Sequence, residues 1–273
     1  MPELPEVETT LRGIEPYVLG SELTAVVVRN TSLRWPVPVD ELESLLSLRV
    51  QACSRRAKYI LLTFTDQRSL MLHLGMSGSM RVLPTNTPAT KHDHIDLVFA
   101  NTHIVRFNDP RRFGSCLVLT PPLNSHPLLN RLGPEPLTQE FDGDYLFARS
   151  RNKKTAIKTF IMDGSVVVGV GNIYASEALF MAGVRPTLAA GRLSKARYVA
   201  LAECIKKVLA QAIKAGGTTL NDFSQADGKP GYFSQELFVY GRLGEPCITC
   251  GTAISAKVIG QRNSYFCTQC QSF

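Results

Sequence analysis

Short apolar runs recur at close spacing through the first half of the chain. Turns rich in Gly, Pro, Asn and Asp separate these runs, which cover residues 23–29, 59–65, 69–74, 95–100, 104–107 and 116–120. Several short β-forming runs divided by turn residues are typical of antiparallel sheets. The pattern therefore predicts an antiparallel sandwich or barrel in this half of the chain.

Helical spacing replaces this pattern after Pro121-Pro122. We expect Ser194 to cap a helix over residues 195–215, because serine is a favoured N-cap and two glycines follow at 216–217. A second helix is expected from about Gly171 to Met181. The second half therefore predicts a mainly helical domain.

Four of the seven cysteines form two Cys-x2-Cys pairs with sixteen residues between them, namely Cys247, Cys250, Cys267 and Cys270. This spacing is typical of a zinc ribbon, in which each tight turn directs two thiolates at one ion. Residues 256–259 and 263–266 are expected to form its strands. Because four thiolates complete the coordination, the zinc is expected to be structural, with no catalytic metal. Two chance pairs of reduced thiols are the alternative.

Composition and charge narrow the class of protein. Of the 273 residues, 44% are hydrophobic and 19% charged, which allows a buried core and excludes a mainly disordered chain. Lys and Arg number 30 against 23 acids, a balance that suits a polyanionic partner but also an ordinary basic enzyme. No run approaches the roughly 18 apolar residues of a membrane span, and no leader pattern opens the chain. We therefore expect a cytoplasmic protein with no membrane partner.

The N-terminal sequence MPELPEVE places two prolines and three glutamates at the start of a helix. Structure alone can explain them, since proline is tolerated in a first turn and acids favour the positive helix end. A chemical interpretation also exists. Removal of Met1 would leave Pro2 with a free secondary amine, which attacks a carbonyl-like carbon and forms an iminium, while Glu3 moves protons.

Further polar motifs are weak signals when each is taken alone. They are the lysine of RRAKY, the glycine-rich turn HLGMSG, the paired histidines of KHDH on one side of an extended segment, the arginine turn DPRRFG, the basic run 149–158, and a Gly-x-Gly helix start suited to phosphate. Each of them is also explained by a structural role, either as an anchor of the hydrophobic core or as the solvated face of a helix or strand. Their occurrence together with the cysteine pairs favours a common function.

Together these segments resemble the bacterial formamidopyrimidine-DNA glycosylases. The resemblance rests on MPELPEVE, RRAKY, HLGMSG, KHDH, DPRRFG, KKTAIK, VGVGNIYASE, DGKPGYF and the cysteine pairs, in order along the chain. It implies a multidomain α+β fold with an N-terminal β-sandwich and helix (1–122), a helix–two-turn–helix domain (123–235) and a zinc ribbon (236–273). It also implies a DNA glycosylase and abasic-site lyase that removes 8-oxoguanine and formamidopyrimidines.

The resemblance assigns roles to matching residues of this chain. Pro2 is the nucleophile and Glu3 its proton donor, while Lys58 and Arg262 serve the β- and δ-elimination steps or clamp the leaving phosphates. Three residues fill the space left by the flipped base: Met76, Arg111 and Phe113. Three others hold the DNA strand: His92, Lys153 and Asn172.

The expected partner is double-stranded DNA with an oxidised purine opposite cytosine, bound by a monomer. The segment Gln225–Phe233 is expected to close over the flipped base. Two alternatives stay open. An endonuclease VIII-like enzyme would use the same proline chemistry on oxidised pyrimidines, and a non-catalytic zinc-ribbon protein would bind DNA without needing a free Pro2.

Overall fold

The computed structural model describes residues 2–217 and 237–272. Met1 and the expected loop Gln225–Phe233 lie outside these described residues. The described chain divides into two compact units, one of residues 2–130 and 215–217 and one of residues 131–214 and 237–272.

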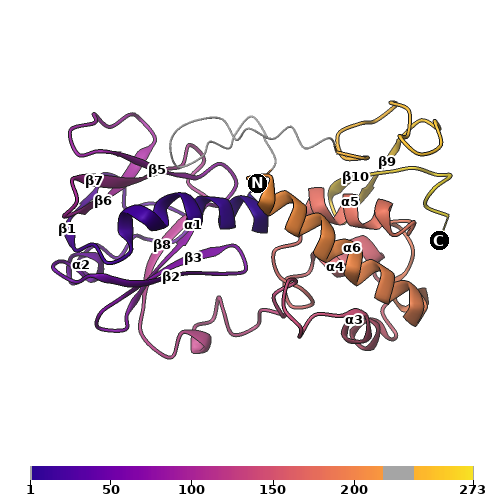
Figure 1. Ribbon diagram of the computed structural model, residues 1–273, viewed down its shortest axis with the longest axis horizontal. Coiled ribbons are helices and arrows are strands. Elements are labelled where there is room, and N and C mark those ends of the chain that lie inside the picture. Colours follow the sequence, from indigo (N-terminus) through magenta and orange to yellow (C-terminus); the bar gives the residue numbers. More distant parts are fainter. Residues whose placement is uncertain (1, 218–236, 273) are drawn as a thin grey trace. The chain divides into compact units, whose positions relative to one another are not determined.

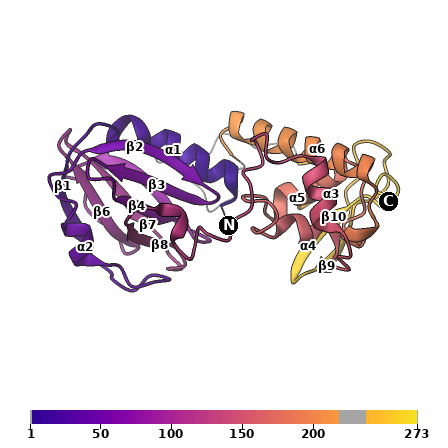
Figure 2. The same ribbon diagram turned by 90° about the horizontal axis from the view of Figure 1, so that it is seen from below.

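The first unit is a sandwich of two antiparallel four-stranded sheets, which confirms the expected β-sandwich (Figures 1 and 2). One sheet has the order β1-β6-β7-β5, with bounds Leu23–Val28, Asp93–Phe99, His103–Asn108 and Ser79–Pro84. The other has the order β2-β3-β4-β8, with bounds Val50–Arg56, Tyr59–Phe64, Ser69–His73 and Ser115–Leu119. Apolar side chains of both sheets form one core, which includes Leu62, Leu70, Leu97 and Phe107.

Helix α1 (Leu4–Val18) packs on this core through the apolar face that the sequence predicts. Val7, Leu11 and Ile14 are buried in the same cluster as the strands. Helix α2 (Val39–Glu43) and a short 3-10 turn (η1, Leu123–Ser125) complete the unit. Strands β2 and β5 are the two that the apolar pattern does not predict.

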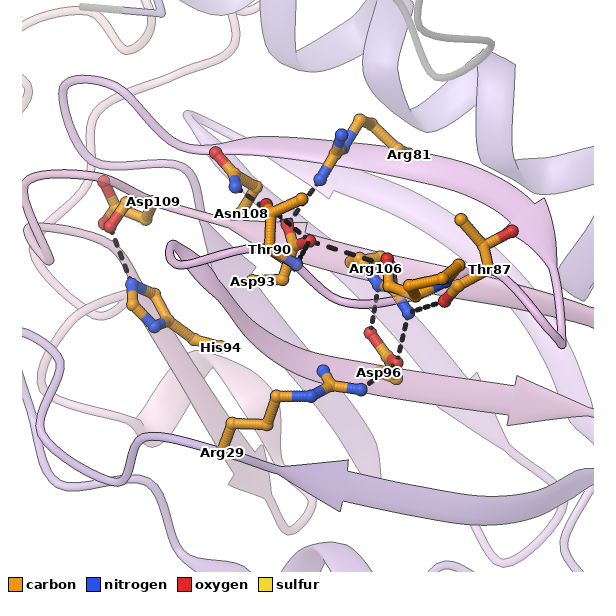
Figure 3. Close-up of polar contacts among 11 residues, drawn as sticks. Arg29, Arg81, Thr87, Thr90, Asp93, His94, Asp96, Arg106, Asn108 and Asp109 are labelled. Atoms are coloured by element: carbon orange, nitrogen blue, oxygen red, sulfur yellow. Dashed lines mark hydrogen bonds and ion pairs between the residues drawn. The ribbon is translucent and has the colours of Figure 1, made fainter.

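Charged side chains are buried on the sheet that contains β6 and β7 (Figure 3). The guanidinium of Arg106, 2% exposed, donates to both carboxylate oxygens of Asp96 at 2.7 and 2.8 Å. Arg29 donates to the same carboxylate at 2.6 Å. Burial alone would raise the pKa of Asp96, but the hydrogen bonds from Arg106 and Arg29 outweigh it and lower the pKa.

The second unit consists of helices and a short hairpin. Its helices are α3 (Gly143–Ser150), α4 (Ile157–Met162), α5 (Asn172–Met181) and α6 (Lys195–Lys214), with a 3-10 turn η2 (Ala190–Arg192). Helix α6 packs against α3 and α5. A Cβ atom at Gly143 would lie 2.4 Å from the Val199 Cα, so the close approach of α3 to α6 requires glycine.

The helices α5 and α6 begin and end within a residue of the positions expected from sequence. The Ser194 hydroxyl accepts a hydrogen bond from the Arg197 amide at 3.4 Å, as expected of an N-cap. Strands β9 (Ser255–Ile259) and β10 (Arg262–Phe266) form the ribbon hairpin. Within the described residues, no helix is both long enough and apolar enough to cross a membrane.

The buried Arg106–Asp96 pair generates a stability prediction. Asp96→Asn should lower the free energy of unfolding by about 3 kcal/mol at pH 7, because a buried guanidinium loses its bidentate carboxylate partner and keeps only the Asp93 carboxylate at 3.6 Å. Since the folded-state pKa of Asp96 is lowered, its contribution is present above the unfolded pKa of about 3.9 and lost as pH falls through the folded value.

Urea unfolding of both proteins between pH 3 and pH 7 measures this difference. Glu43→Gln, at an exposed carboxylate of the same unit, is the control and should leave the unfolding free energy nearly unchanged. A difference between wild type and Asp96→Asn that stays constant down to pH 3 would contradict the assignment.

Candidate functional site

The first turn of helix α1 fixes the position of Pro2. Glu3 precedes the helix, and its backbone N–H donates to the Glu6 carboxylate at 2.8 Å. Both glutamates are buried, at 3% and 4% exposure. Carboxylates are favoured here because the first N–H groups of a helix lack intrahelical partners and the positive end of the helix dipole lies at this terminus. Pro2 is therefore followed at once by a turn that is hydrogen-bonded and buried.

Lys58 lies in the tight turn between β2 and β3. Arg56 pairs with Tyr59, so Ala57 and Lys58 form a two-residue connection, with Ala57 at a positive φ of 54°. The Arg55 guanidinium donates to the Glu8 carboxylate at 2.9 Å and to the Ala57 carbonyl at 2.8 Å. This one side chain ties the turn that carries Lys58 to helix α1.

His73 is a neighbour of Lys58 to which the sequence assigns no role, although it is the first residue of the HLGMSG motif. It pairs with Tyr59 across β3 and β4, and the two ring centroids are 5.0 Å apart. Burial, together with the nearby charges of Lys58 and Arg34, lowers the pKa of His73 to about 4. Because its Nδ1 accepts from the Gly75 amide at 3.0 Å, the neutral ring carries its proton on Nε2. Only the strand register could have indicated this residue.

Met76, Arg111 and Phe113 lie on two turns whose backbones touch. A Cβ atom at Gly75 would lie 2.5 Å from the Gly114 nitrogen, so no side chain fits between the turns. Phe113 is 43% exposed, and the Arg111 guanidinium carbon lies 4.9 Å from its ring centroid. Met76 is partly exposed. The structure thus brings these three predicted residues together on one unit.

The two histidines of KHDH differ in their surroundings, contrary to the expectation that they share one side. His92 is partly exposed immediately before β6, whereas His94 is buried and donates from Nε2 to the Asp109 carbonyl at 2.8 Å (Figure 3). A bulge between Asp93 and Ile95 interrupts the alternation of sides. His92 remains available to a ligand, while His94 is an internal support.

The predicted residues of the second unit lie on its helices and hairpin. Asn172 is the first residue of α5, and its amide donates to the Asn263 carbonyl at 3.1 Å. Arg262 is exposed at the start of β10, directly before Asn263. Lys153 is exposed between α3 and α4, where its carbonyl accepts from the Gly191 amide at 2.9 Å.

Lys158 is a further residue, at the end of the basic run 149–158, to which the sequence assigns no individual role. It is 1% exposed, and its ammonium donates to Asn172 Oδ1 at 2.7 Å and to the Ser264 hydroxyl at 2.8 Å. The Ser264 hydroxyl in turn donates to the Arg262 carbonyl at 3.2 Å. Lys158 therefore supports Asn172 and the start of β10 together.

Glu177 of α5 attaches the ribbon to the helices. Its carboxylate accepts three backbone N–H groups, from Phe238 at 2.7 Å, Val239 at 3.1 Å and Tyr240 at 2.9 Å. Burial raises the pKa of Glu177, and these hydrogen bonds partly offset that effect. The ribbon is thus held by buried backbone contacts as well as by its metal.

The four predicted cysteines meet in the ribbon, with sulfur atoms all within 4.8 Å of one another. Cys247 and Cys270 sulfurs are 3.9 Å apart, and those of Cys250 and Cys267 are 3.5 Å apart. A tetrahedral ion with Zn–S bonds of about 2.3 Å requires sulfur separations of about 3.8 Å, so the cluster fits zinc. The four thiols bind a structural zinc ion, as the sequence predicts.

Family models match three successive parts of the chain. They are described as formamidopyrimidine-DNA glycosylase N-terminal domain (residues 1–116), formamidopyrimidine-DNA glycosylase H2TH domain (residues 132–224), and zinc finger found in FPG and IleRS (residues 244–272). Their order agrees with the sandwich, helices and ribbon of the structure.

Individual relatives match this chain over nearly its full length. The formamidopyrimidine-DNA glycosylase of Alteromonas mediterranea is 57% identical, covering 99% of this chain and 100% of its own. The crystal structure of the Thermus thermophilus MutM (Fpg) protein is 37% identical, with a TM-score of 0.89 and 99% of each chain covered. A Lactococcus lactis FPG mutant, crystallised with Fapy-dG containing DNA, is 31% identical, with a TM-score of 0.92 and 100% coverage of both chains. The chain therefore belongs to the formamidopyrimidine-DNA glycosylase family.

Proposed function

We propose that this protein excises oxidised purines from duplex DNA in base excision repair and then cleaves the strand at the abasic site. Its full-length identity of 55–57% to proteins named formamidopyrimidine-DNA glycosylase supports the activity. A Lactococcus lactis relative has been crystallised with DNA containing an abasic site. The observation within this chain that carries the proposal is Pro2 directly before the buried Glu3–Glu6 turn.

Pro2 acts as the nucleophile once Met1 is removed. In a peptide bond the proline nitrogen is an amide whose lone pair is delocalised, so it cannot attack carbon. As an N-terminal amine it titrates near pH 7.7–8.0 in model peptides, which leaves a reactive fraction at neutral pH. The amine attacks C1′ of the damaged nucleotide and displaces the base, while Glu3 protonates the sugar oxygen as the ring opens.

The resulting iminium acidifies the C2′ hydrogens of the opened sugar. Loss of a C2′ proton expels the 3′ phosphate in a β-elimination, and a second, δ-elimination expels the 5′ phosphate. We assign Lys58 to the first step and Arg262 to the second, as proton-transfer groups or as cations that stabilise the leaving phosphates. The Arg55 contacts that tie the Lys58 turn to α1 support its place near the nucleophile.

Base flipping requires replacement of the lost stacking, at a cost of a few kcal/mol. The exposed Phe113 ring and the Met76 thioether supply apolar surface for the vacated space. Arg111 reads the base left opposite. An orphaned cytosine offers two adjacent acceptors, O2 and N3, that suit a guanidinium fork, whereas adenine offers a donor beside an acceptor. The enzyme therefore prefers lesions opposite cytosine.

Three residues hold the DNA strand in this account: His92, Lys153 and Asn172. The net charge of +7 favours the same polyanion. We further propose that the enzyme acts as a monomer, with functional divisions at 1–122, 123–235 and 236–273. One strand-scission event needs only one copy of each assigned residue.

A paired-substrate assay tests the function. Duplexes carrying 8-oxoguanine opposite cytosine should be cleaved at least tenfold faster than duplexes carrying thymine glycol opposite adenine, since the proposed reading by Arg111 favours an orphaned cytosine over an orphaned adenine. Single-turnover rates on end-labelled DNA measure the ratio. Faster cleavage of thymine glycol would establish the endonuclease VIII-like alternative, and binding without cleavage of either would establish the non-catalytic one.

Removal of one zinc ligand gives a second prediction. Cys247→Ser should lose zinc and the order of the ribbon, because metal binding and folding of such small domains are coupled. Arg262 would then lose its place, and DNA cleavage should fall at least a hundredfold while the sandwich stays folded.

Zinc content, circular dichroism and cleavage rate measure these effects. The matched control is Cys204→Ser, a half-buried thiol outside the cluster, which should keep zinc and activity. Full cleavage by zinc-free Cys247→Ser protein would contradict the proposal that the ribbon holds Arg262 in position.

A further inference from the structure

Asp109, the first residue of the arginine turn, is fully buried and makes hydrogen bonds in several directions. Its carboxylate accepts from the Ser77 hydroxyl at 2.9 Å, from the Gly114 amide at 2.8 Å and from the Arg111 amide at 3.3 Å. Its own amide donates to the His92 carbonyl at 3.0 Å. A buried carboxylate with this many donors fixes the segments that supply them.

The donors come from the two turns that carry the exposed side chains. Ser77 follows Met76 in the turn after β4, and Gly114 follows Phe113 in the turn before β8. A Cβ atom at Gly114 would lie 2.7 Å from the His73 carbonyl, so the turns approach too closely for any side chain to separate them. The Asp109 carboxylate is therefore the polar link between two backbones already in contact.

The backbone of Asp109 is held as firmly as its side chain. Its carbonyl accepts from His94 Nε2 at 2.8 Å (Figure 3). Its amide donates to the carbonyl of His92, the residue before β6. Because a carbonyl only accepts, the His94 nitrogen must carry the proton. Asp109 thus connects the paired strands β6 and β7 to turns whose outer side chains are exposed.

We propose that Asp109 is a positioning residue for reading the base opposite the lesion, which it performs by fixing the turns of Met76, Arg111 and Phe113. The inference rests on the proposed function, in which these three side chains enter the vacated space. Arg111 is exposed and packs only against Phe113 among the ring contacts of the described residues. A guanidinium fork discriminates between bases only when its backbone is held within a fraction of an ångström.

Asp109→Asn removes one acceptor while keeping the size of the side chain. The amide nitrogen can face Ser77, but at least one of the Arg111 and Gly114 amides then loses strength in its hydrogen bond. The ratio of kcat/KM for 8-oxoguanine opposite cytosine and opposite adenine should fall about tenfold, toward the ratio of Arg111→Ala. This ratio does not depend on the fraction of active enzyme, so reduced folding cannot mimic the effect.

Matched controls separate positioning from stability. Asp96→Asn makes the same chemical change at a buried carboxylate that does not contact the turns, and it should keep the wild-type ratio. Ser77→Ala, which removes one donor to Asp109, should lower the ratio by about threefold. Ser69→Ala removes a hydroxyl contact between Ser69 of β4 and Thr63 of β3, away from Asp109, and should leave the ratio unchanged.

Amide hydrogen exchange in DNA-free protein tests the holding step without reference to activity. In Asp109→Asn at least one of the Arg111 and Gly114 amides should exchange at least tenfold faster, because the two donate to different oxygens of the carboxylate, while the Val105 amide of β7 keeps its rate. Unchanged protection of both amides would overturn the inference. So would a wild-type base ratio in Asp109→Asn when Arg111→Ala has lost it.

A third possible result would contradict the proposed function, and not the role of Asp109. If Arg111→Ala kept the wild-type ratio, the assignment of Arg111 as the reading residue would be wrong. The exchange rates of Gly114 and Arg111 would then decide alone whether Asp109 fixes the turns.

Discussion

A nucleophile at the end of a polypeptide works only when that end is held in place, and chain ends are normally the least ordered part of a domain. The first turn of α1 meets this requirement through the bond from the Glu3 amide to the Glu6 carboxylate and through the burial of Leu4 and of both glutamates. The Arg55 guanidinium then ties the Lys58 turn to the same helix through Glu8. The proposed chemistry depends on this one fixed turn more than on any other feature of the first unit.

The rest of the site follows a common design, in which exposed functional side chains are supported by buried polar ones. Lys158 supports Asn172 and the β10 strand, Glu177 holds the entry to the ribbon, and Asp109 holds the two exposed turns. Each of these supports bonds to groups of segments distant in sequence. Such contacts are costly to break in a low-dielectric interior. The buried side chains therefore hold the exposed ones in position.

Sequence alone predicts what is encoded locally. The cysteine spacing indicates the zinc ribbon, and apolar runs indicate most strands, but they do not indicate β2 and β5, because polar and charged residues interrupt the apolar residues of both strands. The supports were missed for another reason. Lys158 and His73 look like ordinary polar residues until strand register and helix packing bring their partners together. The roles of Lys58 and Arg262 came from family resemblance, since no spacing rule links residues so far apart.

The central claim is that the amine of Pro2 becomes covalently bonded to the damaged sugar. Borohydride reduces an iminium to a stable amine, so it traps such a complex in a form that survives denaturation. We predict that protein beginning at Pro2 is trapped on 8-oxoguanine DNA, with the DNA attached to the N-terminal residue as shown by mass spectrometry. A fraction that keeps Met1 should bind the same DNA without being trapped. Full activity and trapping by protein that keeps Met1 would contradict the claim.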